Sequence, residues 1–139
     1  MPFLDTLKEK LNDNGFQRIW VDPIRRGAIS FGHDTNDPIR GRVYINNGYI
    51  DIAAYSMRKF RTEEVRNAFT RIGERLVAQQ PGQYYTRPAI GGDGISTIGI
   101  QHERQLSNNT QDQDDDANWA WDRINESIVP ILNQINPNH

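Results

Sequence analysis

The sequence has 139 residues, with 16 Lys and Arg, 18 Asp and Glu, three His and no Cys, so its formal net charge is −2. A chain of this length suits a single domain with a continuous core. The lack of Cys excludes disulfides, Cys-ligated metal clusters and thiol nucleophiles. No apolar run reaches the roughly 18 residues of a transmembrane helix, and the start lacks the pattern of a signal peptide. We therefore expect a soluble, cytoplasmic protein that does not bind membranes.

Charge is distributed unevenly along the chain. Residues 15–90 hold 12 basic and 7 acidic residues, whereas residues 91–139 hold 2 and 8. The chain has 13 Arg and 3 Lys, and Arg binds phosphate and carboxylate groups with two parallel hydrogen bonds and stacks on aromatic rings. The middle of the chain therefore either faces an anionic partner or carries ordinary surface ion pairs.

The first part of the chain predicts one helix and two strands. Apolar residues recur at helical spacing at Leu4, Leu7 and Leu11. Asn14-Gly15 then supplies a left-handed helix stop. An alternating pattern over residues 16–21, ended by Asp22-Pro23, and a second one over residues 26–32 predict two strands, which a loop at 33–38 follows.

The clearest local pattern is a hairpin centred on Asn47-Gly48, the preferred pair for a tight type I′ turn. A two-residue turn brings the segments 42–46 and 49–53 together. One face of the hairpin then carries the four aliphatic side chains of Val43, Ile45, Ile50 and Ile52. The other face carries Arg42, Tyr44, Tyr49 and Asp51. A register shift of one residue would expose the aliphatic side chains to water, so this pairing is strongly specified.

A second helix is expected to begin after Thr62, a favourable N-cap residue, and to end before Pro81-Gly82. Its apolar stripe consists of Val65, Ala68, Phe69, Ile72 and Leu76. Residues 84–87 and 95–101 follow as a strand pair around the glycine-rich loop at 91–94. Pro88 indicates that the first of these strands lies at a sheet edge.

The last part of the chain predicts a mobile acidic loop around residues 107–116 and then a helix that begins near Asp116 and is kinked or split at Pro130. The predicted order of elements is α-β-β-β-β-α-β-β-α. This order indicates a single α+β domain over residues 1–139, with one antiparallel sheet and the helices packed on one of its faces.

Few residues suggest catalysis or metal binding. The three histidines, His33, His102 and His139, lie in a loop or at the ends of elements and form no helical metal-binding pair, and no nucleophile motif surrounds any Ser. Asp51 lies on a strand, but no Glu-x-Lys or Gln-x-Lys triplet follows it, as a restriction-type nuclease would require. An acidic cluster either coordinates calcium or magnesium or forms a solvated loop and helix cap; its members are Asp112, Asp114, Asp115 and Asp116. We expect no catalytic residue, no bound metal and no cofactor.

A surface is the stronger candidate. Arg18 and Trp20 share one face of their strand, and this face could continue onto the polar face of the hairpin. The candidate binding residues are Arg18, Trp20, Arg42, Tyr44, Tyr49 and Asp51. Arg, Tyr and Trp are enriched at interface hot spots and also stack on unpaired bases beside phosphates. Alternatively, the last helix or the long loop covers this face, and the aromatic side chains belong to the core.

Four segments give the chain a resemblance to a known family: GRVYINNGYIDIAAY, RIGERL, GISTIGI and DANWAWDRINESIVPIL. Together they resemble a bacterial domain of unknown function of about this length, which occurs alone or appended to restriction- and nuclease-type proteins. The resemblance implies a small α+β domain in a defence or mobile-element setting. It carries over no catalytic residues.

We therefore predict a non-catalytic protein-binding or adaptor domain that uses an exposed Arg, Tyr and Trp face. Its partner would be another protein or a second copy of the chain in a homodimer. The alternative is a module that binds single-stranded nucleic acid on the same face, which the overall acidity of the chain disfavours. A metal-dependent enzyme is the third hypothesis.

Overall fold

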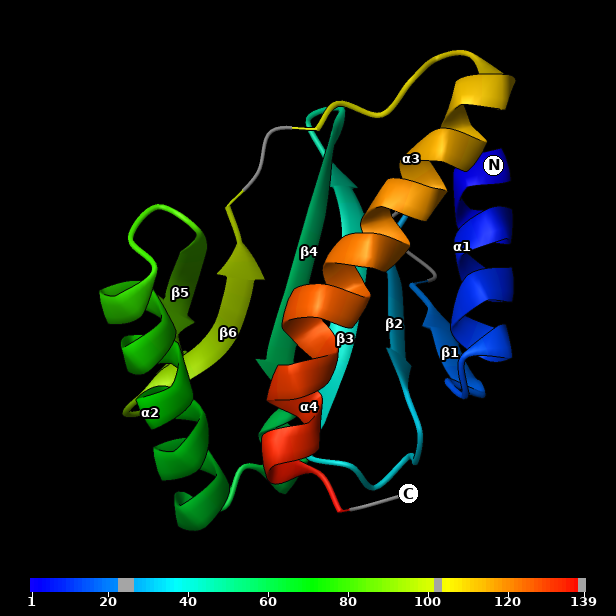
Figure 1. Ribbon diagram of the computed structural model, residues 1–139. Coiled ribbons are helices and arrows are strands. Elements are labelled where there is room, and N and C mark those ends of the chain that lie inside the picture. The colour runs from blue at the N-terminus through cyan, green and yellow to red at the C-terminus, as the bar shows by residue number, and fades with distance from the viewer. Residues whose placement is uncertain (23–26, 102–103, 138–139) are drawn as a thin grey trace.

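The computed structural model describes residues 1–22, 27–101 and 104–137 (Figure 1). The helical segments are α1 (Pro2–Asp13), η1 (Arg58–Phe60, a 3-10 turn), α2 (Glu63–Gln79), α3 (Thr110–Arg123), η2 (Ile124–Ile128, a π-helical turn) and α4 (Val129–Ile135). The strands are β1 (Arg18–Val21), β2 (Ile29–Gly32), β3 (Ile39–Asn46), β4 (Tyr49–Ser56), β5 (Tyr84–Pro88) and β6 (Ile95–Ile100).

The strands form one six-stranded sheet in the order β1-β2-β3-β4-β6-β5, and every neighbouring pair is antiparallel. The helices lie on one side of the sheet, with α3 and α4 crossing in front of β3 and β4, α1 beside α3, and α2 over β5 and β6 (Figure 1). The predicted α+β fold with helices packed on one face is confirmed. So is the edge position of the strand that contains Pro88.

The β3–β4 hairpin forms as its sequence predicts. Asn47 and Gly48 have φ angles of 52° and 83°, which place both turn residues in the left-handed region that a type I′ turn requires. The register pairs Ile45 with Ile50 and Val43 with Ile52. Of these four aliphatic side chains, three are fully buried and Ile45 packs against the same core from a partly buried position.

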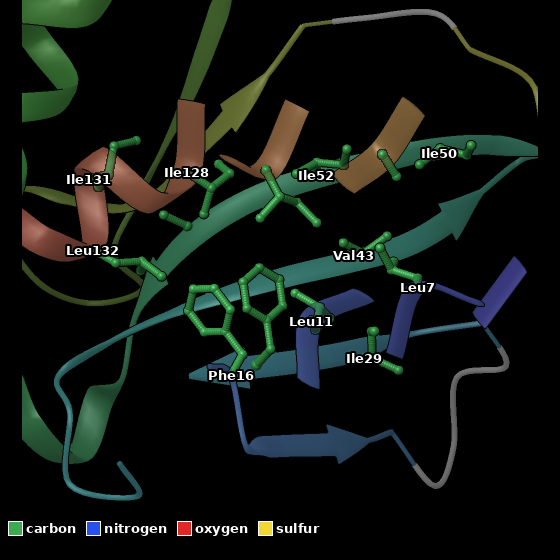
Figure 2. Packing of buried hydrophobic residues seen from close by; sticks show 14 of the residues in the cluster. Leu7, Leu11, Phe16, Ile29, Val43, Ile50, Ile52, Ile128, Ile131 and Leu132 are labelled. Carbon is green, nitrogen blue, oxygen red and sulfur yellow. The ribbon is translucent and has the colours of Figure 1, made fainter. Parts of the chain in front are cut away.

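The core lies between the sheet and the helices. Figure 2 shows Val43 and Ile52 pointing from the central strands toward Leu11 of α1 and toward Ile128 of the C-terminal helical segment. Burial of this continuous apolar layer supplies most of the driving force for folding. Because these side chains alternate along the strands, the intervening residues of the same strands point to the side without helices.

The N-terminal end of α2 also forms as predicted. The Thr62 hydroxyl accepts a hydrogen bond of 3.2 Å from the Val65 N–H, which satisfies one of the otherwise unpaired donors in the first turn. Glu63 and Glu64 lie in that turn, where the helix dipole favours negative charge.

The prediction of a loop through Asp116 is wrong, because α3 begins at Thr110. Asn109 caps this helix by accepting a hydrogen bond from the Gln111 N–H. The Gln113 side chain donates to the Ser107 carbonyl and accepts from the N–H of Phe3 in α1. Polar contacts rather than apolar periodicity hold this first turn, so the hydrophobic pattern did not reveal it.

The predicted kink or split at Pro130 is present only as a short π-helical turn just before it. The helix passes through the π-helical turn η2 and continues as α4, with Pro130 in the first turn of α4. Pro130 lacks an N–H donor, so the regular α-helical hydrogen bonding is interrupted where η2 passes into α4.

Two strand starts differ from the predictions. The first strand begins at Arg18 instead of Phe16, and the second begins at Ile29. Pro23 and Arg26, at the predicted end of the first strand and start of the second, lie outside the described residues. No helix in the described ranges is both long and apolar enough to cross a membrane.

Candidate functional site

The six candidate binding residues lie on the same face of the sheet, the one opposite the helices. The strand pairings place Trp20 opposite Ser30, Ser30 opposite Arg42, and Tyr44 opposite Asp51. We call this side the open face. Its main side chains are those of Arg18, Trp20, Ser30, Arg40, Arg42, Tyr44, Tyr49, Asp51, Tyr55, Tyr85 and Arg87.

The open face is covered by its own side chains instead of by a helix. Arg18 is exposed, Tyr49 is 44% exposed, and Trp20 and Arg42 are half-buried. Tyr44 is only 6% exposed, so the expectation that it offers a free contact surface is wrong. The neighbouring Arg and Asp side chains of the same face shield its ring, and among the described helices none lies on this side.

Arginine side chains lie against the aromatic rings of the open face. The Arg40 guanidinium is 3.6 Å from the centroid of the Trp20 ring. The Arg42 guanidinium lies between two rings, 5.2 Å from the centroid of Tyr44 and 5.5 Å from that of Tyr55. These contacts combine cation–π attraction with burial of the aliphatic part of each Arg. The ring faces of the central strands are therefore largely occupied within the molecule.

Asp51 is the acceptor at the centre of a tyrosine network. The Tyr85 hydroxyl donates a hydrogen bond of 2.7 Å to Asp51 Oδ1. Tyr44 lies opposite Asp51 in the strand register, where this carboxylate acts on its hydroxyl. Burial, and then the hydrogen bond to this carboxylate, raises the pKa of both tyrosines above its ordinary value, although Arg87 opposes the shift. Both hydroxyls therefore stay protonated at neutral pH.

Tyr85 reaches Asp51 by lying across the intervening strand β6. It pairs directly with Gly99 of β6, and Gly99 in turn pairs with Ala53 of β4. A Cβ atom added to Gly99 would lie 2.0 Å from Tyr85 Cζ, so the ring occupies the space that any larger residue would fill. The absence of a side chain at Gly99 thus brings the edge strand β5 into contact with the centre of the open face.

A cleft of about 720 Å³ opens beside this network, with the β3–β4 turn and the start of β4 on one side and the start of β5 and the end of β6 on the other. Its lining includes the amide side chains of Asn46, Asn47 and Gln101 and the rings of Tyr49 and Tyr85. Asp51 is the one charged residue in the described lining. The volume falls in the range of small-ligand sites, about 300–1,000 Å³.

The charges of the sheet and the helices are opposite in sign. The strands carry five charged residues, and all five lie on the open face: Arg18, Arg40, Arg42, Asp51 and Arg87. The four helices and η2 together hold 12 acidic and 6 basic residues. In the described part of the chain, none of the three salt bridges involves a residue of the open face. The five strand residues of this face therefore carry a net positive charge, with four Arg and one Asp.

Sequence reasoning missed part of this site. Arg40 follows the same alternation as Arg42 and could have been included on that ground. Tyr85 and Arg87 share a face of their strand, but nothing in the sequence indicates that β6 pairs with β4 and that β5 lies beyond it. Their place beside Asp51 is a consequence of strand order and of Gly99.

The other candidates take structural positions. His33 stacks on Phe16 with ring centroids 4.4 Å apart, and its Nδ1 lies 3.0 Å from the Gly15 carbonyl oxygen. His102 and His139 lie outside the described residues. Asp116 is buried and bound to Arg104 Nε at 2.9 Å, so it is not part of a solvated cluster. No group of three or more His, Cys, Asp or Glu suited to a metal was found in the ranges the structure describes.

Comparison of the chain with protein-family models, with curated proteins and with solved structures finds no match. The resemblance to a nuclease-associated bacterial domain therefore stays a prediction.

Proposed function

We propose that this protein is a non-catalytic binding domain whose open face docks an acidic segment of another protein. The observation that carries the proposal is the concentration of strand charge on this face, with four Arg and one Asp on the side without helices. Arg18 and Arg87 are exposed and Arg42 is half-buried. A carboxylate-rich partner would complement this surface, and such complementarity favours both encounter and selectivity.

The charge pattern favours a different protein over a second copy of this chain. In a twofold dimer through the open face, the same patch would contribute to both sides of the interface. Its net charge of +3 would then oppose an identical +3. Juxtaposed like charges disfavour such an interface. Self-association would instead require the acidic α3 of one copy to meet the open face of the next, which is a head-to-tail contact.

The aromatic rings favour protein over single-stranded nucleic acid. Base stacking requires accessible ring faces, but Arg40 covers one face of Trp20 and Tyr44 is almost completely buried. Tyr49, at 44% exposure, offers the most accessible ring of the open face. One accessible ring does not form a stacking platform for successive bases.

Selection from a random-peptide display library tests the proposal, because it does not presuppose the partner. We expect wild-type protein to enrich acidic peptides. These should lose at least tenfold in affinity, about 1.4 kcal/mol, for a variant with Arg18→Glu and Arg87→Glu. The matched control is Arg71→Glu with Arg75→Glu, which makes the same charge change on the exposed side of α2. It should retain binding.

The outcomes separate the alternatives. Enrichment of neutral or basic peptides, or equal loss of binding in the two double variants, would contradict docking at the open face. Tight binding of an oligothymidine in place of acidic peptides, with a steep loss of affinity as salt rises, would support nucleic-acid binding instead. A concentration-dependent increase in mass that the Arg18 and Arg87 variant abolishes would show head-to-tail self-association.

A further inference from the structure

The cleft beside Asp51 has a chemistry different from that of the rest of the open face. The surrounding surface is basic, whereas the cleft is lined by one carboxylate, amide groups and tyrosine rings, with no Lys or Arg in its described lining. The cleft is therefore suited to a different chemical group of the ligand from the groups that the arginines bind. We propose that this cleft receives the side-chain ammonium of a lysine within the acidic partner segment. This inference rests on the proposed function.

The carboxylate of Asp51 has capacity for a further donor. An ionised carboxylate offers about four lone-pair positions, and the structure fills one with the Tyr85 hydroxyl and places Tyr44 beside it. Arg42 and Arg87 lie against tyrosine rings, at 5.2 Å and 5.3 Å from the centroids of Tyr44 and Tyr85. Neither forms a salt bridge with Asp51 in the described part of the chain. Among the described side chains, Asp51 therefore has a hydrogen-bond donor but no cationic side chain within salt-bridge distance.

The hydrogen-bond positions that remain available on Asp51 favour an ammonium over a guanidinium. Arg binds carboxylates best through two parallel hydrogen bonds to both oxygens. With the Tyr85 hydroxyl bound to Asp51 and Tyr44 beside it, a single compact donor is easier to accommodate. The rings of Tyr49 and Tyr85 in the cleft wall add attraction for a cation near a ring face.

The rest of the cleft suits the peptide on either side of such a lysine. Asn46, Asn47 and Gln101 present amide donors and acceptors that can pair with backbone groups. A volume of about 720 Å³ exceeds what one lysine side chain occupies and leaves room for flanking main chain. The cleft would bind the lysine, and the arginines would bind the acidic residues around it.

A double-mutant cycle between Asp51 and the peptide lysine tests this inference. The probes are acidic peptides from the selection, acetylated at the N-terminus and amidated at the C-terminus so that lysine is the sole amine. Each is compared with the same peptide in which norleucine replaces lysine. On wild-type protein we expect lysine to improve affinity about tenfold, and on Asp51→Asn we expect the two peptides to bind within twofold of each other. Tyr85→Phe, which keeps the charge of Asp51, should retain the preference for lysine.

Each result decides between the two proposals. Lack of a lysine at a fixed position among the selected peptides, or an equal lysine preference in wild-type protein and Asp51→Asn, would overturn the ammonium site alone. Acidic peptides would still depend on Arg18 and Arg87, and docking at the open face would stand. If no acidic peptide binds, both the docking face and the lysine site are refuted.

Discussion

Replacement of Gly99 by Ala tests how the open face is held together. The added Cβ would lie 2.0 Å from Tyr85 Cζ, whereas ordinary contacts of this type begin near 3.4 Å, so the ring has to move by at least 1.4 Å. A hydroxyl displaced by that much cannot keep its 2.7 Å hydrogen bond to Asp51. The expected consequence is that Tyr85 swings away from β6 and the tyrosine network loses one donor.

The expected change in the free energy of unfolding for Gly99→Ala is the sum of opposing contributions. A hydrogen bond to a charged group contributes about 1.5–3 kcal/mol, and the half-buried position of Tyr85 places this one at the lower end. Alanine in a strand stabilises by about 0.5–1 kcal/mol relative to glycine, because it restricts the unfolded chain. Allowing also for lost ring burial, we expect Gly99→Ala to lower the free energy of unfolding by about 1–2 kcal/mol.

Urea unfolding followed by tryptophan fluorescence measures this change. The decisive control is the same substitution in a Tyr85→Ala background, where the space above Gly99 is empty. There Gly99→Ala should be neutral or stabilising by up to about 1 kcal/mol, so the sign of its effect reverses. An equal destabilisation in both backgrounds would refute the explanation, because it would show that the cost does not arise from the ring.

Three further predictions concern other parts of the chain. Thr62→Ala removes the N-cap of α2 and should lower the free energy of unfolding by about 1 kcal/mol in urea; no change would show that the cap contributes nothing. Asp116→Ala leaves the Arg104 side chain without its buried partner and should cost about 2–3 kcal/mol by the same assay; a loss below about 1 kcal/mol would contradict an anchoring role. The raised pKa values of Tyr44 and Tyr85 stabilise the folded state fully below pH 10, the ordinary tyrosine pKa, and this contribution is lost as pH rises through the folded values. Urea midpoints should therefore fall as the pH rises above about 10, and midpoints that stay constant between about pH 10 and pH 12 would contradict the shifts.

The parts of the fold that the sequence predicted are those with local patterns. The Asn47-Gly48 turn and the alternation around it specify both the register of the hairpin and the side to which Arg42 points. The Thr62 cap is similarly a local feature. Both were read from neighbouring residues, without knowledge of the tertiary structure.

The parts that sequence reasoning missed depend on long-range contacts. The first turn of α3 is held by Gln113, whose partners include the N–H of Phe3, 110 residues away in the sequence. Tyr85 joins the open face because β6 pairs with β4, and the burial of Tyr44 reflects side chains from several strands. No periodicity within a single segment reveals such arrangements.

Chemical-shift mapping by NMR with a selected acidic peptide tests docking at the open face most directly. The account predicts shifts at the Trp20 indole N–H and at the side-chain N–H groups of Arg18, Arg42 and Arg87, with the amides of α1 and α3 unchanged. Shifts confined to α1 and α3 would place the peptide on the opposite side of the molecule and contradict the central claim.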